Sequence, residues 1–379
     1  MQNTKGFLVL KNGKIVLEKY FGSFTKDSLW YWASAGKTIT SFLVGKAQEE
    51  GYLSISDSSS KYLGTGWTNC LSIQENKIKI RNQLTMTTGL DDGVSDNHCT
   101  LDTCLIYKAD AGSRWAYHNA PYTLLDNVLL AATGLNINIY TQSKLKHKTG
   151  MTGLWYMVDY DNVFFSTVRS MARFGLLFQN NCIWNTDTLM YDTSYINQMI
   201  NTSQSLNLSY GYLWWLNGKA SYMSPGSQIV FPGSYASAAP SDMFAGLGKN
   251  GQFVCISKSK GLVVIRMGDA PGSFTEVPTQ FCNQIWVLLN EVMCNGNSIN
   301  EINNQQESIS FYPNPVNNLL TIDLLSRDNL EVEILNLLGE SILKVKNLNK
   351  IDVSALKNGV YFLKLFKGNN FYIRKFIKQ

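Results

Sequence analysis

Strand-like segments lie at both ends of the first 295 residues of this 379-residue chain, and helix-like segments lie between them. At the N-terminal end, FLVL and IVLEKY flank the sequence KNGK, in which Asn12-Gly13 suits a type I′ hairpin turn. Toward the other end, YGYLWWLN and GQFVCISKSKGLVVIRMGD have the composition of strands. This order predicts an α/β (α+β) fold, in which both ends of the block form one sheet around an inserted helical region.

The expected helices follow from apolar periodicity and capping residues. The first spans 34–50, with Gly51 at its C-terminal cap. Further helices are expected at about 120–134, 166–181 and 274–293.

The composition changes after residue 295, and this change predicts a domain boundary. Residues 296–307, GNSINEINNQQE, are polar and rich in Asn and Gln, as is typical of a linker. Residues 308–379 alternate in strand fashion, which predicts a small all-β domain. We therefore expect a domain at 1–295, a linker at 296–307 and a second domain at 308–379.

Charge and cysteine spacing exclude several function classes. The net charge is +5, and the larger domain has no Lys/Arg cluster that would indicate nucleic-acid binding. No CxxC pair or zinc-like histidine spacing is present, so no metal is expected. The apolar runs are too short for a membrane span. Cys99 and Cys104 bracket a short loop and are expected to form a disulfide in an oxidising compartment.

The stretch YWASAGKTIT places Ser34 three residues before Lys37 at the start of the first expected helix. Residues at this spacing share a helix face, so the lysine amine lies within reach of the hydroxyl. The flanking residues are apolar, and burial lowers the pKa of a lysine toward values at which it accepts a proton. The ordinary alternative is a capping serine beside a solvated lysine. A serine nucleophile with a lysine base is the sharper hypothesis.

A second catalytic element has rival candidates. SDN occurs at 95–97 and KTG at 148–150, but SDN lies in a Gly/Asp-rich loop and KTG lacks strand alternation around it. We set both aside in favour of Tyr117-His118-Asn119, which directly precedes an expected helix. Tyr117 is the candidate to share a proton with Lys37, and Asn119 offers an amide to a substrate.

The third element is FAGLGKNGQFVCIS, a glycine-rich turn that enters an apolar strand. Gly246 and Gly248 let backbone approach a substrate closely, and Lys249 follows them. The amides of Ser34 and of a residue near Lys249 are candidates for an oxyanion hole.

Taken together, ASAGKTITSFLVGKAQEEGYLSISD, IRNQLTMTTGLDD, AGSRWAYHNAPYTLL, MARFGLLF and FAGLGKNGQFVCISKSKGLVVIRMG resemble the serine β-lactamase and penicillin-binding-protein-like superfamily, in its class C, carboxylesterase and 6-aminohexanoate-dimer-hydrolase branch. The resemblance implies a five-stranded antiparallel sheet flanked by helices, with the active site beside a helical subdomain. It also implies that Ser34 is acylated, that Lys37 and Tyr117 transfer protons, and that Asn119 contacts substrate. Gly246-Leu247-Gly248 stands where the family has Lys-Thr-Gly or His-Thr-Gly, which disfavours recognition of a β-lactam carboxylate.

The C-terminal segments FYPNPVNNLLTI, VEILNLLGE, IDVSALKNGVYFLKL and RKFIK resemble the type A sorting domain of the type IX secretion system. This resemblance implies a small β-sandwich, a partner in that secretion machinery, and a secreted or cell-surface location. The N-terminus has no visible signal peptide and lacks the family's preceding helix, so we expect that an N-terminal segment is missing or has been removed.

The sequence thus predicts a secreted serine hydrolase that cleaves an amide or ester bond of a small-molecule or peptide substrate, without a cofactor. One alternative is a β-lactamase or D-Ala-D-Ala carboxypeptidase. A second is a non-catalytic cell-surface binding protein on the same scaffold.

Overall fold

The chain divides into two compact units, Met1–Met293 and Cys294–Gln379. The computed structural model describes residues 3–272, 277–293, 310–323, 330–336, 340–367 and 370–379. The expected linker, 296–307, lies outside the described residues.

The first unit is built on an antiparallel sheet with the strand order β2-β1-β13-β12-β11-β8. Its N-terminal strand β1 pairs with β13, so the two ends of the unit meet in the sheet as predicted. The resemblance implied five strands, and the two-residue strand β8 adds a sixth among the described residues. The strands are β1 (Thr4–Lys11), β2 (Lys14–Tyr20), β8 (Trp215–Leu216), β11 (Phe244–Gly248), β12 (Gln252–Ser257) and β13 (Leu262–Gly268).

The hairpin turn between β1 and β2 has the predicted geometry. Asn12 has φ +49° and Gly13 has φ +75°. Both values lie in the left-handed region that a type I′ turn requires.

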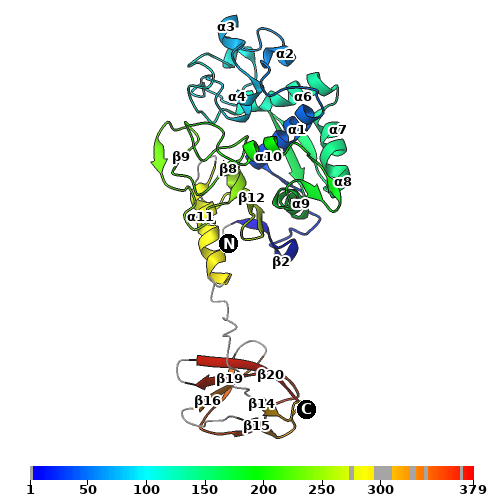
Figure 1. Cartoon of the computed structure of the whole chain (residues 1–379), viewed down its shortest axis with the longest axis vertical. Coiled ribbons are helices and arrows are strands. Elements are labelled where there is room, and N and C mark those ends of the chain that lie inside the picture. Colours follow the sequence, from blue (N-terminus) through cyan, green and yellow to red (C-terminus); the bar gives the residue numbers. More distant parts are fainter. Residues whose placement is uncertain (1–2, 273–276, 294–309, 324–329, 337–339, 368–369) are drawn as a thin grey trace. The chain divides into compact units, whose positions relative to one another are not determined.

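Alternate residues of each strand point to opposite faces of this sheet. Helices cover both faces. The helix α9 (Val168–Gln179) packs on the face of Val254, where its Gly175 leaves room for Val254 and Val263. The helix α11 (Thr279–Val292) packs on the other face, where Phe281 lies 5.8 Å from Phe253 between ring centroids. Figure 1 shows α9 and α11 on either side of β12.

The expected first and second helices are each divided in the structure. The first consists of a 3-10 turn, η1 (Ala33–Gly36), followed by α1 (Lys37–Glu49), and Gly51 adopts a left-handed φ of +78° just beyond it. The second consists of α5 (Asn119–Thr123) and α6 (Leu125–Thr133).

Short elements complete the first unit. The helices are α2 (Ser60–Leu63), α3 (Ser72–Glu75), α4 (Ile80–Leu84), η2 (Asp102–Cys104), α7 (Ile137–Thr141), η3 (Gln142–Lys146), α8 (His147–Thr149), α10 (Thr193–Met199) and η4 (Lys249–Gly251). The strands are β3 (Trp30–Tyr31), β4 (Leu154–Val158), β5 (Asp161–Ser166), β6 (Ile183–Trp184), β7 (Asp187–Thr188), β9 (Ser221–Met223) and β10 (Val230–Pro232).

The second unit is all-β, as predicted. Two antiparallel sheets, β14-β15-β18 and β17-β16-β19-β20, share one apolar core that includes Leu320, Val332 and Leu363. The strands are β14 (Ser310–Tyr312), β15 (Leu319–Asp323), β16 (Leu330–Leu335), β17 (Ser341–Lys346), β18 (Lys350–Asp352), β19 (Gly359–Lys367) and β20 (Asn370–Lys378).

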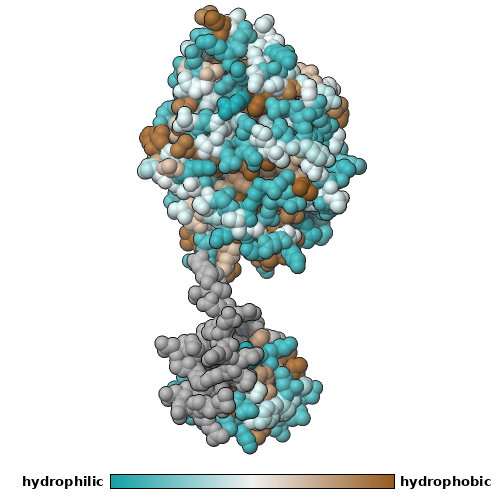
Figure 2. All heavy atoms as spheres, viewed as in Figure 1, coloured by the Kyte–Doolittle hydropathy of each residue, from teal (hydrophilic) through white to brown (hydrophobic). Residues whose placement is uncertain are grey.

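The visible surface of the first unit is largely hydrophilic, with apolar residues in separate groups (Figure 2). Within the described parts of the chain, no helix combines the length and apolar character needed to cross a bilayer.

Candidate active site

Ser34 lies in the 3-10 turn η1, directly before α1, and it is not the capping residue of that helix. The preceding residue, Ala33, has φ +46°, a left-handed conformation that is unfavourable for a residue with a side chain. Trp32 anchors this bend, since its backbone N–H donates to the Phe164 carbonyl at 2.8 Å and its Nε1 donates to Ser166 Oγ at 2.7 Å. Beside this bend, Ser34 lines a cavity.

Lys37 Nζ donates a hydrogen bond to Ser34 Oγ at 3.1 Å. Lys37 is only 4% exposed, and its Nζ lies 4.1 Å from the ring centroid of Tyr122 and 5.4 Å from that of Tyr117. The structure therefore brings together the serine, the lysine and the tyrosine that the sequence predicted. The amine stands close enough to the hydroxyl to exchange a proton with it.

Tyr117 is held from behind by aromatic side chains. Its ring stacks on Trp215 at a centroid distance of 5.8 Å and meets the edge of Tyr210 at 6.3 Å. Tyr117 is 2% exposed and is not among the described residues that line the cavity. It therefore approaches Lys37 from inside the protein, through a position that neighbouring rings keep rigid.

The cavity beside Ser34 has a volume of about 360 Å³. Of the predicted site residues, Ser34, Lys37, Asn119 and Lys249 line it. The described lining residues are Tyr31, Ala33, Ser34, Lys37, Asp96, His98, Asn119, Tyr122, Asp159, Tyr160, Asp161, Asn162, Val163 and Lys249.

Gly246 and Gly248 lie beneath the Ser34 turn, outside the described lining of the cavity. A Cβ atom on Gly248 would stand 2.5 Å from the Trp32 carbonyl oxygen, and one on Gly246 would stand 3.2 Å from that of Ala35. The glycines therefore permit a close approach, as predicted, but the approaching backbone is that of η1. Their place in the structure is to seat the nucleophile turn against β11.

Lys249 is presented to the cavity by the rigid turn η4. Arg266 is buried and donates to the carbonyls of Asn250 and Gly251 in this turn. Asn250 has φ +62°, and its Nδ2 donates to the Tyr31 hydroxyl at 2.7 Å. These contacts fix the backbone that follows Gly248 beside Ser34.

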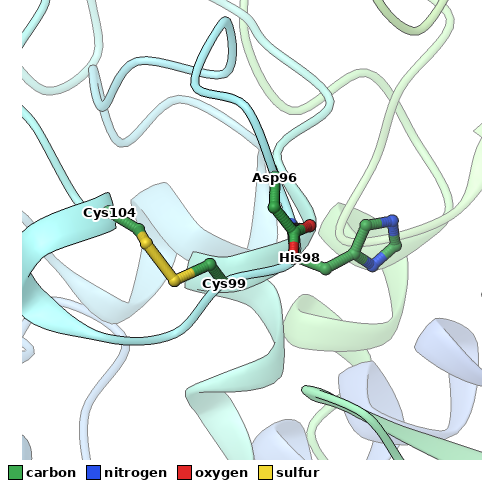
Figure 3. The surroundings of a disulfide bond; sticks show 4 residues. All are labelled: Asp96, His98, Cys99 and Cys104. Carbon is green, nitrogen blue, oxygen red and sulfur yellow. Dashed lines mark hydrogen bonds between the residues drawn. A yellow bond between two sulfur atoms is a disulfide. The ribbon is translucent and has the colours of Figure 1, made fainter.

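The SDN loop borders the cavity through one of its three residues. Asp96 and His98 line the cavity, whereas Ser95 is not among the described lining residues. The predicted disulfide between Cys99 and Cys104 is present, with its two Cα atoms 5.9 Å apart. Figure 3 shows the disulfide and the His98 ring directed to opposite sides of this segment.

The KTG triplet lies away from Ser34, as expected. Lys148 is on the short helix α8, and its Nζ forms an ion pair with Asp187 at 3.0 Å. None of the three residues is among those described at the cavity.

The β4–β5 hairpin forms a cavity wall that the sequence analysis missed. Its turn and the start of β5 contribute residues 159–163 to the lining. Asp161 Oδ2 lies 2.6 Å from His98 Nδ1. Burial raises the pKa of Asp161, but the His98 contact and the positive charge of Lys37 outweigh burial, and the pKa lies below its usual value. The sequence signal was available, because DYDN separates LWYMV and VFFS, two short stretches rich in the aromatic and β-branched residues that favour strands.

Asp126 supports this wall from behind and gives a pH-dependent prediction. Its Oδ2 accepts from Asn162 Nδ2 at 2.9 Å, its Oδ1 is buried with no partner among the described residues, and burial raises its pKa to about 7. Between the ordinary carboxyl pKa and about 7, the native state therefore holds a proton that the unfolded state releases, so stability falls as pH rises. We expect Asp126→Asn to remove this fall, which is at most about 1.4 kcal/mol per pH unit.

Melting temperatures from pH 4 to pH 8 measure this effect. The control is Asp102→Asn, because Asp102 is exposed. An unchanged pH slope in Asp126→Asn would contradict the assignment.

Within the described residues, no group of three or more His, Cys, Asp or Glu side chains is arranged to hold a metal ion. The arrangement at Ser34 offers a hydroxyl, an amine and a buried phenol instead. These are the groups of acyl transfer by a serine nucleophile with an adjacent base.

Residues 5–279 match the family model described as Beta-lactamase, so the chain belongs to the beta-lactamase family. Residues 310–379 match the secretion system C-terminal sorting domain, which indicates a secreted or cell-surface protein. Both findings confirm the resemblances that the sequence motifs indicated.

Solved structures with the same fold include a putative 6-aminohexanoate-dimer hydrolase from Bacillus anthracis, with a TM-score of 0.59 and 17% identity over 77% of this chain and 80% of that chain. A D-stereospecific amidohydrolase from Streptomyces sp. has a TM-score of 0.52 and 12% identity over 71% of this chain and 91% of that one. An uncharacterized protein of Alkalihalophilus pseudofirmus is 24% identical over 306 residues, which is 70% of this chain and 83% of the relative.

Proposed function

We propose that this protein is a secreted serine hydrolase that cleaves an amide or ester bond through an acyl-enzyme on Ser34. The observation that supports this most directly is the 3.1 Å contact between Lys37 Nζ and Ser34 Oγ at a cavity of about 360 Å³. Two structures of the same fold, named as a dimer hydrolase and an amidohydrolase, point to the same reaction class.

The proposed reaction begins from the unprotonated form of the Lys37 amine, which accepts the proton of the Ser34 hydroxyl as Oγ attacks the substrate carbonyl. The Lys37 and Tyr117 pair then passes a proton to the leaving group. The backbone N–H groups of Ser34 and Lys249 are the candidate donors to the developing oxyanion, because both residues border the cavity. Asn119 orients the acyl group, and a water molecule then hydrolyses the ester bond to Ser34.

The acyl-enzyme gives the direct test. We expect a fluorophosphonate probe to add one adduct mass at Ser34, because an activated serine hydroxyl attacks phosphorus as it attacks a carbonyl. Peptide mass spectrometry locates the adduct, and Ser34→Ala is the control. Absence of an adduct on the wild-type protein, together with no hydrolysis of p-nitrophenyl esters, would contradict the proposal and favour a binding protein on this scaffold.

One observation favours a second candidate, a β-lactamase or D-Ala-D-Ala carboxypeptidase. Lys249 lines the cavity, and its ammonium offers a positive charge to a substrate carboxylate although the Lys-Thr-Gly side chains are absent. Turnover of nitrocefin beside a panel of p-nitrophenyl esters separates the two candidates. We expect the esters to be the better substrates.

For the C-terminal unit, we propose the type IX secretion machinery as the partner. The match of residues 310–379 to a sorting domain supports this assignment.

A further inference from the structure

The amine of Lys37 lies over the face of the Tyr122 ring, a contact that the sequence motifs did not indicate. Lys37 Nζ is 4.1 Å from the centroid of this ring, closer than the 5.4 Å that separates it from the ring centroid of Tyr117. The same Nζ donates to Ser34 Oγ at 3.1 Å. The amine therefore has both the hydroxyl of Ser34 and the face of a phenol ring as neighbours.

The position of the Tyr122 ring is set by packing. Tyr122 lies on α5, it is buried, and it borders the cavity. Its hydroxyl lies 3.5 Å from Thr40 Oγ1 on α1, so the polar end of the ring has a partner other than Lys37. Tyr122 thus presents its ring face, and not its hydroxyl, to the amine.

The Tyr122 side chain is an uncharged neighbour of this amine. Burial raises the pKa of its hydroxyl well above the ordinary value, so the phenol stays neutral at physiological pH. A neutral phenol ring still attracts a cation, because the face of its π-system is negative. This attraction is stronger where water is excluded, and Lys37 is buried.

We infer that Tyr122 is a positioning residue that acts through Lys37, because its ring face stabilises the positive charge that Lys37 gains when it takes the proton of Ser34. This inference rests on the proposed hydrolase function. In that step the O–H bond of Ser34 breaks as Oγ bonds to the carbonyl carbon, and the proton moves to Nζ, which becomes an ammonium. The ring attracts a charge that forms during the step, so it lowers the energy of the transition state more than that of the bound substrate.

Other charged groups near Lys37 stay the same when the ring alone is changed. Asp161 is near enough to interact electrostatically with Lys37. The charged or titratable groups that border the cavity or Lys37 are Tyr31 on β3, Asp96 and His98 on the loop before Cys99, Tyr117 before α5, Asp159, Tyr160 and Asp161 on the β4–β5 hairpin, and Lys249 on η4. A series of variants at residue 122 therefore isolates the contribution of the ring.

Fluorination of this ring tests the attraction without removing the side chain. Fluorine atoms withdraw negative charge from the face of a ring and change its shape little. Tyr122→Phe is the reference of the series, and it is compared with Tyr122→4-fluorophenylalanine and Tyr122→3,4,5-trifluorophenylalanine, both introduced by amber suppression in the full chain. The measured quantity is kcat/KM for p-nitrophenyl acetate from pH 5 to pH 9.

The expected result has two parts with one cause. Relative to Tyr122→Phe, the trifluorinated ring should lower the pH-independent plateau of kcat/KM by about fivefold, and Tyr122→Leu should lower it by about tenfold. The acid side of the profile should move down by about half a pH unit in the trifluorinated variant, because a less stabilised ammonium forms only at lower pH. A merely structural change would lower the plateau without this displacement.

Phe42 provides the matched control for fluorination. It is buried on α1, the helix of Lys37, and its ring meets that of Phe178 at a centroid distance of 6.1 Å. Phe42→3,4,5-trifluorophenylalanine should therefore keep the plateau and the acid side of the wild-type profile.

If the trifluorinated ring gave the same profile as Tyr122→Phe, the inference would be overturned and the hydrolase function would stand. A lower plateau with an unmoved acid side would also overturn it. If the wild-type protein hydrolyses no ester and Ser34 takes no fluorophosphonate, the hydrolase proposal fails and the inference fails with it. Thermal melting identifies a variant that does not fold, and the monofluorinated ring then provides the same test with a smaller effect.

Discussion

Replacement of Lys37 by alanine is expected to abolish turnover, with a loss in kcat of at least about 10³-fold. Lys37 is the one residue, among those described, whose amine donates to Ser34 Oγ. Without it the hydroxyl keeps its proton and attacks a carbonyl poorly. Hydrolysis of p-nitrophenyl acetate and the rate of fluorophosphonate labelling at Ser34 both measure this loss.

The fold should survive the change. Alanine removes a buried amine and keeps a good helix former at the first position of α1. Lys46→Ala is the matched control, because Lys46 lies on the same helix but pairs with Glu49 away from the cavity. Circular dichroism melting should show folded protein in both variants, and wild-type rates in Lys37→Ala would remove lysine from the mechanism.

Replacement of Gly248 by alanine is expected to reduce both stability and activity. Its Cβ atom would stand 2.5 Å from the Trp32 carbonyl oxygen and 3.0 Å from the Ala35 nitrogen, and neither backbone atom can rotate away. Overpacking of this kind costs about 1–3 kcal/mol. A shift of the Ser34 turn by about 1 Å would also lower kcat by about 10²-fold.

Gly36→Ala provides the matched control for this effect. Gly36 lies in η1, the turn that also holds Ser34, but a Cβ atom on Gly36 would meet its nearest atom, on Trp155, at 3.5 Å. That distance is an ordinary van der Waals contact, so the variant should melt and react like the wild type. Measured together, thermal melting and the rate of ester hydrolysis separate the two variants. If both variants melted at the same temperature and hydrolysed the ester at the same rate, the close approach of η1 to β11 would not determine the stability or the activity of the site.

The parts of the site that the sequence predicted are those set by local geometry or by distinctive motifs. Ser34 and Lys37 are in contact because residues three apart on a helical turn lie on the same side of that turn. The disulfide of Cys99 and Cys104 spans five residues, and short loops of this kind favour pairing. Tyr117 was found through its motif and its order along the chain.

The parts that escaped prediction depend on long-range contacts. The hairpin wall is placed by pairing of β5 with the distant strand β3. The SDN loop reaches the cavity because the Asn97 carbonyl accepts from the Ala120 N–H at 2.9 Å and its side chain accepts from Asn119. Gly246 and Gly248 were expected to face a substrate, yet they face η1. No local pattern in the chain specifies which of two backbones will approach a glycine.

The disulfide next to His98 connects the structure near this cavity with the compartment in which the disulfide forms. Thiols remain reduced in the cytoplasm, and disulfides form after export to an oxidising compartment. The sorting domain at residues 310–379 indicates that the chain is exported. The disulfide therefore closes residues 99–104 after export, directly beside the segment with Asp96 and His98. Oxidation of one pair of cysteines thus restrains the backbone that directly follows His98, a residue of the cavity lining.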